Sequence, residues 1–460
     1  MDAGLLRALC FVVLACAAHA SCSSDMSCSL NGVCAHPTGQ CVCDTAWTGD
    51  RCQTLRVLPA DRASGLRLRG NTDRSDDATA GSSSSSAVPA APSSSSSSST
   101  GGAGVPPRNI STWGGAVQYS EEDGLWHMWA SQMRGFCGIQ SWSTNSQVVH
   151  ATASSPRGAY ALAPTAGGTG ANSSIVWPRF AHEADVTRGP GGEWVMYFVM
   201  NPAPEAEEDC SNLTTTRATT ASHKAAAAGG LVGSGNLRYR GDQPTYMSVA
   251  QSAVGPWSSP QVVIPVNNFS NADSNLAAVI RTNGSVVGLW RVRTFPAAAP
   301  GGSSRIHLLT ASDWRDPASY TVAREELFPG VGYRGTEDPH VYRDARGGFH
   351  AIFHHMDDAD CPNVDDLPAC GAHAFSADGR AWTYGGVAFG RSVTFTDTGA
   401  AFDFVRRERP HMIFGKDGTT PVAVTNGVAF ADQPAPAPYD KESATYTVLQ
   451  PVNAPASALR

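Results

Sequence analysis

One pattern, a short strand followed by a glycine-bearing turn and a second strand, occurs five times between residues 109 and 450. It is clearest at Gly335–Met356, where the acidic corner Glu337-Asp338-Pro339 opens a strand. A polar turn follows, and the chain returns through Phe349–Phe353. Since one such unit cannot bury its apolar residues alone, the repeat requires neighbouring copies to pack together.

The five units align on the central apolar pair of their first strands. These first strands are Trp113–Tyr119, His182–Arg188, Asn275–Arg281, Glu337–Arg343 and Glu408–Phe414. The second strands are Leu125–Ala130, Trp194–Val199, Val286–Arg291, Phe349–His354 and Pro421–Val428. Third strands follow in four units. Such units favour the blades of a β-propeller over a two-sheet sandwich, which also contains many short strands. We therefore expect an all-β fold, with a five-bladed β-propeller over residues 107–460.

The N-terminal segment indicates the compartment of the protein, and the net charge limits its partners. Residues 1–20 carry a short apolar run that ends in Ala18-His19-Ala20, which predicts a cleaved signal peptide because the run is too short for a membrane anchor. We expect no membrane span in the rest of the chain. The net charge of −7 without a Lys/Arg cluster argues against a nucleic-acid partner. Asn-x-Ser/Thr sequons occur at Asn109, Asn172, Asn212, Asn268 and Asn283. The sequence predicts a secreted glycoprotein.

Residues 21–53 hold six of the cysteines in a segment too small to bury a core, so disulfides must stabilise it. The spacing Cys41-x-Cys43, five residues, Gly49, two residues, Cys52, with Trp47 between, resembles the end of EGF-like modules. The resemblance implies the pairs Cys22–Cys34, Cys28–Cys41 and Cys43–Cys52. Zinc is the alternative for cysteine-rich spacing, but secretion argues against it. Through this module we expect contacts with extracellular proteins.

Residues 54–106 contain the serine runs Ser82–Ser86 and Ser93–Ser99 and predict a disordered Ser/Ala/Pro-rich linker. Four more cysteines follow the linker. We expect Cys361–Cys370 and Cys137–Cys210 to pair, although the sequence leaves the exchanged pairing open.

The repeat resembles the five-bladed propeller glycoside hydrolases of the arabinanase, xylosidase, levansucrase and invertase superfamily, which includes family 43. The motifs that carry the resemblance are the Glu337-Asp338-Pro339 corner and two turns, Ser376-x-Asp-Gly-x-x-Trp382 and Ser252-x-x-Gly-Pro-Trp257. The resemblance covers about residues 109 to 450. It implies a tunnel whose mouth collects the starts of the five first strands, where carboxyl groups could hydrolyse a glycan.

Candidate site residues follow from the aligned starts of these strands. We assign Glu337, Asp338 and Glu183 as catalytic. The candidate substrate-binding residues are Asp185, Asp273, Asn275, Glu408, Arg409, His182 and Trp113. The first blade has Trp113-Gly114-Gly115 where the resemblance implies a carboxylate. For Glu408 and Arg409 the alternative is a structural ion pair, and for Glu337 and Asp338 it is capping of a turn.

The leading hypothesis is a secreted glycoside hydrolase-like enzyme acting on a polysaccharide or glycan. The alternative is a non-catalytic carbohydrate-binding or adhesion protein, motivated by the missing carboxylate of the first blade, and a plain interaction scaffold is the third. We expect no cofactor and no catalytic metal. A structural cation in the tunnel, held partly by His355, is compatible with the sequence.

Overall fold

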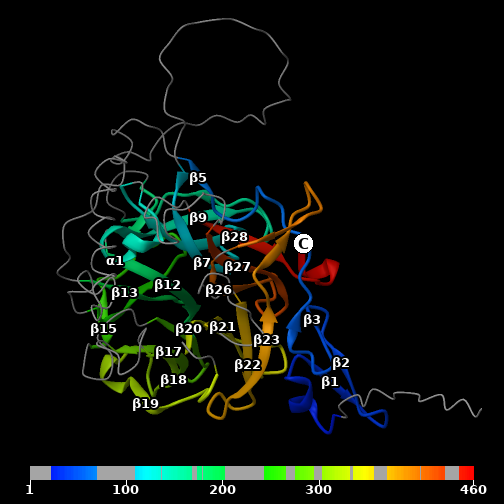
Figure 1. Ribbon diagram of the computed structural model, residues 1–460. Coiled ribbons are helices and arrows are strands. Elements are labelled where there is room, and N and C mark those ends of the chain that lie inside the picture. Colours follow the sequence, from blue (N-terminus) through cyan, green and yellow to red (C-terminus); the bar gives the residue numbers. More distant parts are fainter. Residues whose placement is uncertain are drawn as a thin grey trace, which may run out of the picture.

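The computed structural model describes residues 22–69, 109–135, 137–167, 173–178, 180–201, 243–265, 275–294, 303–331, 335–356, 370–404, 406–429 and 445–459. The predicted signal peptide lies outside these residues. The regular secondary structure of the described chain is almost entirely β-strand (Figure 1). Its single α-helix is α1 (Trp142–Asn145), accompanied by a few short 3-10 turns. The prediction of an all-β fold is confirmed.

The strands follow one another in antiparallel order within each unit. The first unit is β7 (Thr112–Tyr119), β8 (Trp126–Met133), β9 (Ser146–Ala153) and β10 (Ala161–Leu162), with β11 (Ile175–Trp177) also on β9. The second is β12 (Ala181–Arg188), β13 (Trp194–Met200), β14 (Thr245–Ala250) and β15 (Gln261–Ile264). The third is β16 (Leu276–Ile280), β17 (Val286–Thr294), β18 (Ser303–Ala311) and β19 (Thr321–Glu326). The fourth is β20 (Gly335–Arg343), β21 (Phe349–Met356), β22 (Cys370–Ser376) and β23 (Thr383–Phe389). The fifth is β26 (Arg406–Phe414), β27 (Pro421–Ala429) and β28 (Thr445–Pro451).

The first strands of the five units contact one another in a ring. In sequence order, β7 contacts β12, β12 contacts β16, β16 contacts β20 and β20 contacts β26, and β26 contacts β7 again. Figure 1 shows β7, β12, β20 and β26 at the centre of the body. The third and fourth units share one hydrogen-bonded sheet through the parallel pair Ser304 and Gly335. The ring places the starts of the first strands together, as expected for a propeller, while the count of five blades stays a prediction.

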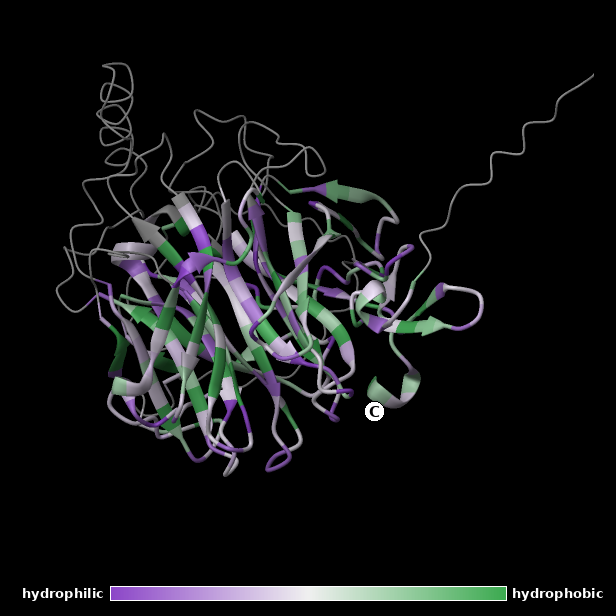
Figure 2. Cartoon of the chain, turned by 90° about the horizontal axis from the view of Figure 1, so that it is seen from below, coloured by the Kyte–Doolittle hydropathy of each residue, from purple (hydrophilic) through white to green (hydrophobic). Residues whose placement is uncertain are grey.

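Hydrophobic clusters fill the space between neighbouring units. One cluster joins the fifth unit to the first through Ile413 and Met128, and another joins the first to the second through Trp129 and Phe198. Further clusters join the second unit to the third and the third to the fourth. Hydrophobic residues therefore lie along the strands, while the turns are polar (Figure 2). Face-to-face packing of successive sheets holds the ring together.

The EGF-like module packs directly on the propeller body. Its disulfides are Cys22–Cys34, Cys28–Cys41 and Cys43–Cys52, which confirms the predicted pairing. Its strands are β1 (Gly32–Ala35), β2 (Gln40–Cys43) and β3 (Trp47–Thr48), and β3 pairs with β4 (Thr54–Leu55). Buried Trp47 belongs to a hydrophobic cluster that also contains Tyr342 of β20 and Phe389 of β23, and its ring lies 4.7 Å from that of His373.

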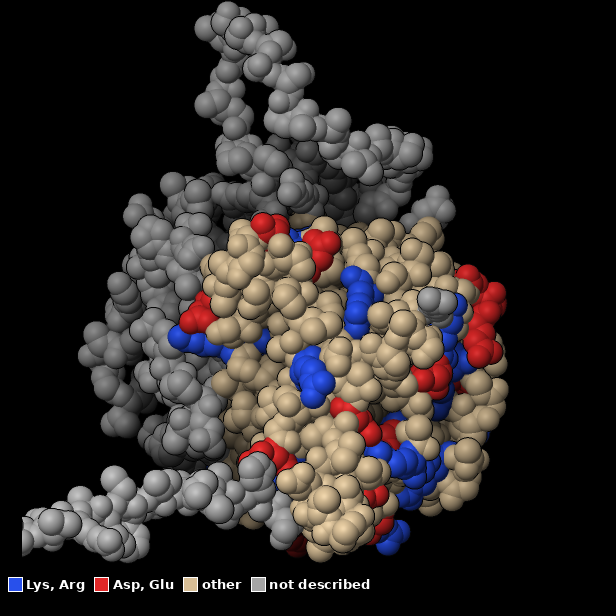
Figure 3. Space-filling model, turned by 90° about the vertical axis from the view of Figure 1, so that its right-hand side faces the viewer, with Lys and Arg blue, Asp and Glu red and all other residues tan. Residues whose placement is uncertain are grey.

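Polar contacts surround this packed interface. Arg346 donates to the Asp44 carboxylate at 2.5 Å, and Asn31 Nδ2 lies 3.3 Å from His373 Nε2. Figure 3 looks onto this side of the molecule, where charged side chains of both signs are scattered.

The prediction of a disordered linker is wrong for the first residues of that segment. Residues 54–69 are ordered along the body instead of forming a free tether: Val57 pairs with Val452, and Leu66 pairs with Thr447 of β28. At its end, β5 (Leu68–Arg69) pairs with β6 (Asn109–Ile110). The physical reason is the burial of Leu55 and Leu66, which a solvated linker would leave in water. The serine runs lie outside the described residues.

Two of the four cysteines that follow the linker lie among the described residues. Cys137 and Cys370 are disulfide-bonded. Their expected partners, Cys210 and Cys361, lie outside the described residues, so the pairing stays a prediction. Among the helices of the described chain, none is long and apolar enough to cross a membrane.

Candidate active site

Four of the five first strands carry the same irregularity near their start. In β7, β12, β20 and β26, two residues lie opposite one residue of the second strand, between the paired positions Trp113/Ala116, His182/Asp185, Glu337/His340 and Glu408/His411. Each is a β-bulge, which bends a strand and redirects a side chain. The bulges lie at equivalent positions, so they form one level of the ring.

The first bulged residue of each strand has a left-handed backbone. The φ angles are 62° at Gly114, 58° at Glu183, 53° at Asp338 and 52° at Arg409. Glycine adopts this conformation freely, whereas a residue with a side chain loses about 1 kcal/mol or more. Three charged residues therefore occupy strained positions at the same level, and strain of this kind is concentrated at functional sites.

Glu183 and Asp338 are joined by a single amide. Asn275, directly before β16, donates its Nδ2 to Glu183 Oε2 and, at 2.8 Å, to Asp338 Oδ1. The Ser131 hydroxyl accepts the backbone N–H of Glu183 at 3.1 Å. Asp338 Oδ2 accepts the backbone N–H of Arg409 at 3.1 Å. Residues from five strands or strand starts thus meet at one buried point.

Glu337, beside Asp338, is held by two cations. Its Oε2 pairs with Arg291 of β17, and its Oε1 lies 2.9 Å from His354 Nδ1. Burial opposes a charged imidazole, but Glu408 and the hydrogen bond to Glu337 raise the pKa of His354 to about 9. Arg291 also donates to the Ser304 hydroxyl at 2.6 Å. Since Glu337 is paired with the two cations Arg291 and His354, we assign it to orienting and tuning its neighbours instead of exchanging protons.

Asp338 has the environment of an acid that keeps its proton near neutral pH. Burial, followed by the negative charge of Glu337, raises the pKa of Asp338 to about 7. Arg409 and His354 oppose this shift and do not reverse it. A carboxyl group poised in this way suits general acid catalysis.

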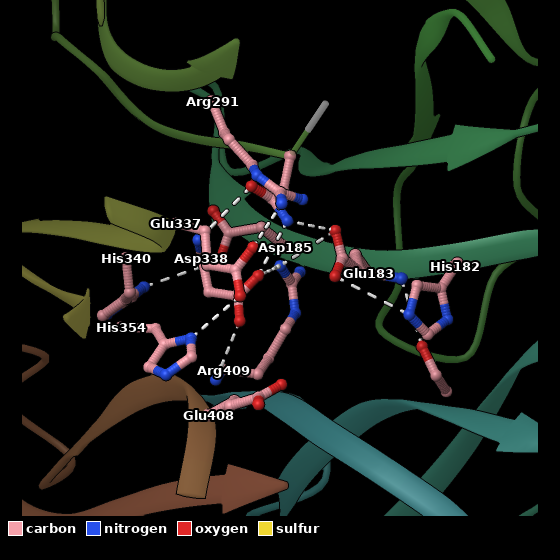
Figure 4. Close-up of polar contacts among 12 residues, drawn as sticks. His182, Glu183, Asp185, Arg291, Glu337, Asp338, His340, His354, Glu408 and Arg409 are labelled. Carbon is pink, nitrogen blue, oxygen red and sulfur yellow. Dashed lines mark hydrogen bonds and ion pairs between the residues drawn. The ribbon is translucent and has the colours of Figure 1, made fainter. Parts of the chain in front are cut away.

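Arg409 and Glu408, both of β26, complete this buried group. The side chain of Arg409 rises between Glu183 and Asp338 (Figure 4), with Nη1 3.6 Å from Glu183 Oε2 and 3.8 Å from Asp338 Oδ1. Glu408 lies 3.7 Å from Arg406 Nε. We call the level formed by Glu183, Asn275, Glu337, Asp338, Glu408 and Arg409 the cup.

A second buried group lies one step farther along the strands, at the positions that follow the bulges. Asp185 Oδ1 is 3.2 Å from His411 Nε2 and 3.5 Å from His340 Nδ1, and the two imidazole centroids are 3.6 Å apart. Burial raises the pKa of Asp185, but the two imidazoles outweigh it and leave that pKa well below its usual range. Asp185 therefore lies below the cup and contacts histidines instead of the other candidate residues.

His182 and Trp113 flank the cup without entering its acid cluster. His182 Nε2 is 3.6 Å from Glu183 Oε1, and its Nδ1 is 2.7 Å from the Ser146 hydroxyl. Its ring stacks on Trp142 at 5.2 Å. Trp113 is buried in a hydrophobic cluster that includes Met133, so we assign it to packing instead of sugar stacking. Asp273 lies outside the described residues.

Apart from Cys22, Cys28 and Cys41, which are disulfide-bonded, two groups of described residues are close enough to hold a metal ion. They are Asp185, His340 and His411, and Glu337, Asp338, His354 and Glu408. In the second group Arg291 and His354 already balance Glu337. The first group offers two imidazoles and one carboxylate, a donor set suited to a transition metal. His355, the predicted cation ligand, belongs to neither group.

Sequence reasoning missed three contributors: Arg291, His340 and His411. Arg291 lies on a second strand, whereas the candidates were taken only from the starts of the first strands. His340 and His411 share the third position after Glu337 and Glu408, and Asp185 has the same position in β12. Comparing that position across the units would have revealed the group formed by Asp185, His340 and His411.

Comparisons with known proteins identify the N-terminal module and find solved structures to which the chain is similar. Residues 22–52 match the family model of the EGF-like domain. No match was found among curated proteins. Among solved structures, the chain is similar to Zg3597, a family 117 glycoside hydrolase from Zobellia galactanivorans, with 13% identity, a TM-score of 0.41, and coverage of 75% of this chain and 85% of that one. The α-L-arabinofuranosidase PaAbf62A from Podospora anserina, in complex with cellotriose, gives 11% identity, a TM-score of 0.45, and coverage of 75% and 92%. A thermostable family-43 glycoside hydrolase gives 10% identity, a TM-score of 0.43, and coverage of 75% of this chain and 89% of that one. At these identities, the chemistry has to be argued from the residues of this chain.

Proposed function

We propose that the protein is a secreted glycoside hydrolase that cleaves a polysaccharide or glycan in the cup. The observation that carries the proposal is the pair Glu183 and Asp338, two carboxyl groups held by the same Asn275 amide at strained backbone positions. Hydrolysis of a glycosidic bond needs two such groups, one to protonate the leaving oxygen and one to attack or to activate water.

Asp338 takes the role of acid because its pKa is raised to about 7. It transfers its proton to the glycosidic oxygen as the bond from that oxygen to the anomeric carbon breaks. Glu183 attacks the anomeric carbon and forms a glycosyl ester. In the second step, Asp338 accepts a proton from water, the water oxygen bonds to the anomeric carbon, and Glu183 leaves as a carboxylate.

The spacing of the pair favours this two-step route. Because one Nδ2 contacts both carboxylates, the two accepting oxygens can be no farther apart than two hydrogen-bond lengths, about 6 Å. Retaining glycosidases hold their carboxyl groups about 5–5.5 Å apart, whereas inverting enzymes need about 6.5–9.5 Å to admit a water. We therefore expect retention of the anomeric configuration.

The test is the release of reducing sugar from a glycan panel by the full chain and its variants. Glu183→Gln and Asp338→Asn should each lower turnover by about 10²–10⁴-fold, because each removes one of the two carboxyl groups. Glu325→Gln, an exposed change on β19, is the matched control and should leave turnover unchanged. Turnover that survives both cup variants would remove the two carboxyl groups from the chemistry.

A non-catalytic carbohydrate-binding protein is the second candidate, and Gly114 favours it. Gly114 occupies the bulge position of β7 and supplies no carboxylate there. Binding of glycans without any release of reducing sugar would select this function.

The location of the protein also belongs to the proposal. Three disulfides within residues 22–52 are typical of extracellular modules. We expect contacts of this module with other extracellular proteins on the surface left free by the propeller body.

A further inference from the structure

Arg409 occupies the space that a side chain of the first unit would fill. A Cβ atom added at Gly114 would lie 2.4 Å from Arg409 Cγ and 3.2 Å from Arg409 Cδ. The stem of the arginine therefore crosses the bulge of β7. Where the resemblance implies a first-blade carboxylate, this chain presents the cation of the fifth unit instead.

The guanidinium of Arg409 has donors to spare. Its two acidic neighbours lie 3.6 and 3.8 Å away, beyond hydrogen-bond length. Among the described residues, no hydrogen bond from this guanidinium is found, although its side chain is only 10% exposed. Asn275 donates to both Glu183 and Asp338 instead, and Asp338 also accepts the backbone N–H of Arg409.

Arg407, two residues earlier on β26, provides the contrast. It is also buried, and its guanidinium donates to Asn426 at 3.0 Å, to the carbonyl of Gly390 at 2.8 Å and to Gln450 at 2.8 Å. The fold can therefore satisfy a buried arginine on this strand. The unused donors of Arg409 indicate a group that is supplied from outside the described chain.

The charges around Arg409 do not exclude an anion. Arg291 and His354 both contact Glu337, and Arg406 lies near Glu408. With Arg409, four basic groups thus face the four carboxyl groups of the cup, and one of these, Asp338, is largely protonated below pH 7. The carboxyl groups consequently do not make the cup strongly negative.

We propose that Arg409 binds an anionic substituent of the sugar, a carboxylate or a sulfate ester, and so selects an acidic glycan. The planar guanidinium matches both groups through paired hydrogen bonds, which are stronger than those to neutral hydroxyls. The inference rests on the proposed glycan-binding cup, and it does not require that the glycan be cleaved.

The experiment measures binding by the full chain carrying Asp338→Asn, so that hydrolysis does not consume the ligand. The probes are uronate-containing oligosaccharides, the same oligosaccharides with the carboxyl group reduced to an alcohol, and neutral oligosaccharides bearing or lacking a sulfate ester. We expect one acidic series to bind about tenfold to hundredfold more tightly than its neutral counterpart. The series that shows the preference identifies the anion.

Variants then assign the preference to Arg409. Arg409→Gln should abolish it, so that the acidic oligosaccharides bind no more tightly than their neutral counterparts. Arg380→Gln, an exposed change with the same loss of charge, should preserve it. If Arg409→Gln fails to fold, Gly114→Ala provides a second route, because its methyl group must displace the arginine stem and should weaken the preference.

Equal affinity for acidic and neutral oligosaccharides, or a preference that persists in Arg409→Gln, would overturn the inference. Cleavage of neutral glycans would still support the proposed function in that case. A protein that binds no oligosaccharide at all would overturn both proposals.

Discussion

The contact between the EGF-like module and the propeller body differs from the cup in how its residues are used. At the contact, Trp47 is 2% exposed and packs among apolar side chains, while Asn31 and Arg346 find polar partners. In the cup, Asp338 and Arg409 are also buried, but both have a strained backbone. In addition, the pKa of Asp338 is raised, and the guanidinium of Arg409 has hydrogen-bond donors that the described chain does not use. The contact is thus built for stability, whereas the cup gives up stability for binding and chemistry.

The largest effect on stability should come from the contact. Trp47→Ala removes a buried aromatic side chain and should lower the free energy of unfolding by about 3–5 kcal/mol. Turnover on glycans, measured below the unfolding temperature, should stay unchanged because Trp47 does not reach the cup. Chemical denaturation with the disulfides intact measures the stability change.

Arg346→Ala is the control for that variant at the same contact. It removes an ion pair with Asp44 in which both side chains are substantially exposed, at 39% and 44%. An exposed pair contributes about 0–1 kcal/mol, so the change should be small. Equal losses in both variants would show that the apolar packing is not what fastens the module.

A smaller effect of opposite sign should come from the cup. Asp338→Asn should raise the free energy of unfolding by about 0.5–2 kcal/mol, because replacing a strained active-site residue often stabilises a protein. The pKa of Asp338 is about 7 in the folded protein, whereas its ordinary value is 3.8. The stability that protonated Asp338 contributes is therefore fully present below pH 3.8 and is lost as the pH rises through about 7.

Thermal unfolding at pH 5 and pH 8 checks the sign of this effect. The melting temperature of Asp338→Asn should exceed that of the unmodified protein by more at pH 8 than at pH 5. Glu325→Gln should show no such difference between the two pH values. A variant that is less stable than the parent at pH 8 would contradict the account of Asp338 as a strained, neutral acid.

Much of the fold could be predicted because the strands follow local rules. The expected first strand His182–Arg188 is observed as β12 (Ala181–Arg188), and Phe349–His354 is observed within β21 (Phe349–Met356). Alternating apolar residues, with glycines at the turns, specify such strands without reference to the rest of the chain. The cysteine spacing specified the EGF-like module in the same way.

The site was less predictable because its geometry depends on tertiary structure. Aligning the starts of the first strands selected Glu183, Asn275 and Asp338 as candidates, and the structure places the three together. The bulges that turn these side chains inward leave no sign in the hydropathy pattern, since they depend on pairing with the second strands. Arg291 was missed for a related reason: it reaches Glu337 from the middle of β17.

The predicted linker shows the opposite failure, in which composition was given too much weight. Its serine runs suggested a disordered tether from residue 54 onward. Leu55 and Leu66, near its start, are buried against the body. These isolated apolar residues, spread through a polar segment, were the available signal of the strand pairings with Thr447 and Val452.

The central claim is that Asp338 donates a proton to a glycan bound in the cup. The most direct test is the dependence of kcat/KM on pH for the best substrate of the panel, measured from pH 5 to pH 9. With the pKa of Asp338 raised to about 7, kcat/KM should fall as the pH rises through that value, and the residual rate of Asp338→Asn should lack this step. A rate that stays level or increases between pH 7 and pH 9 would contradict the claim.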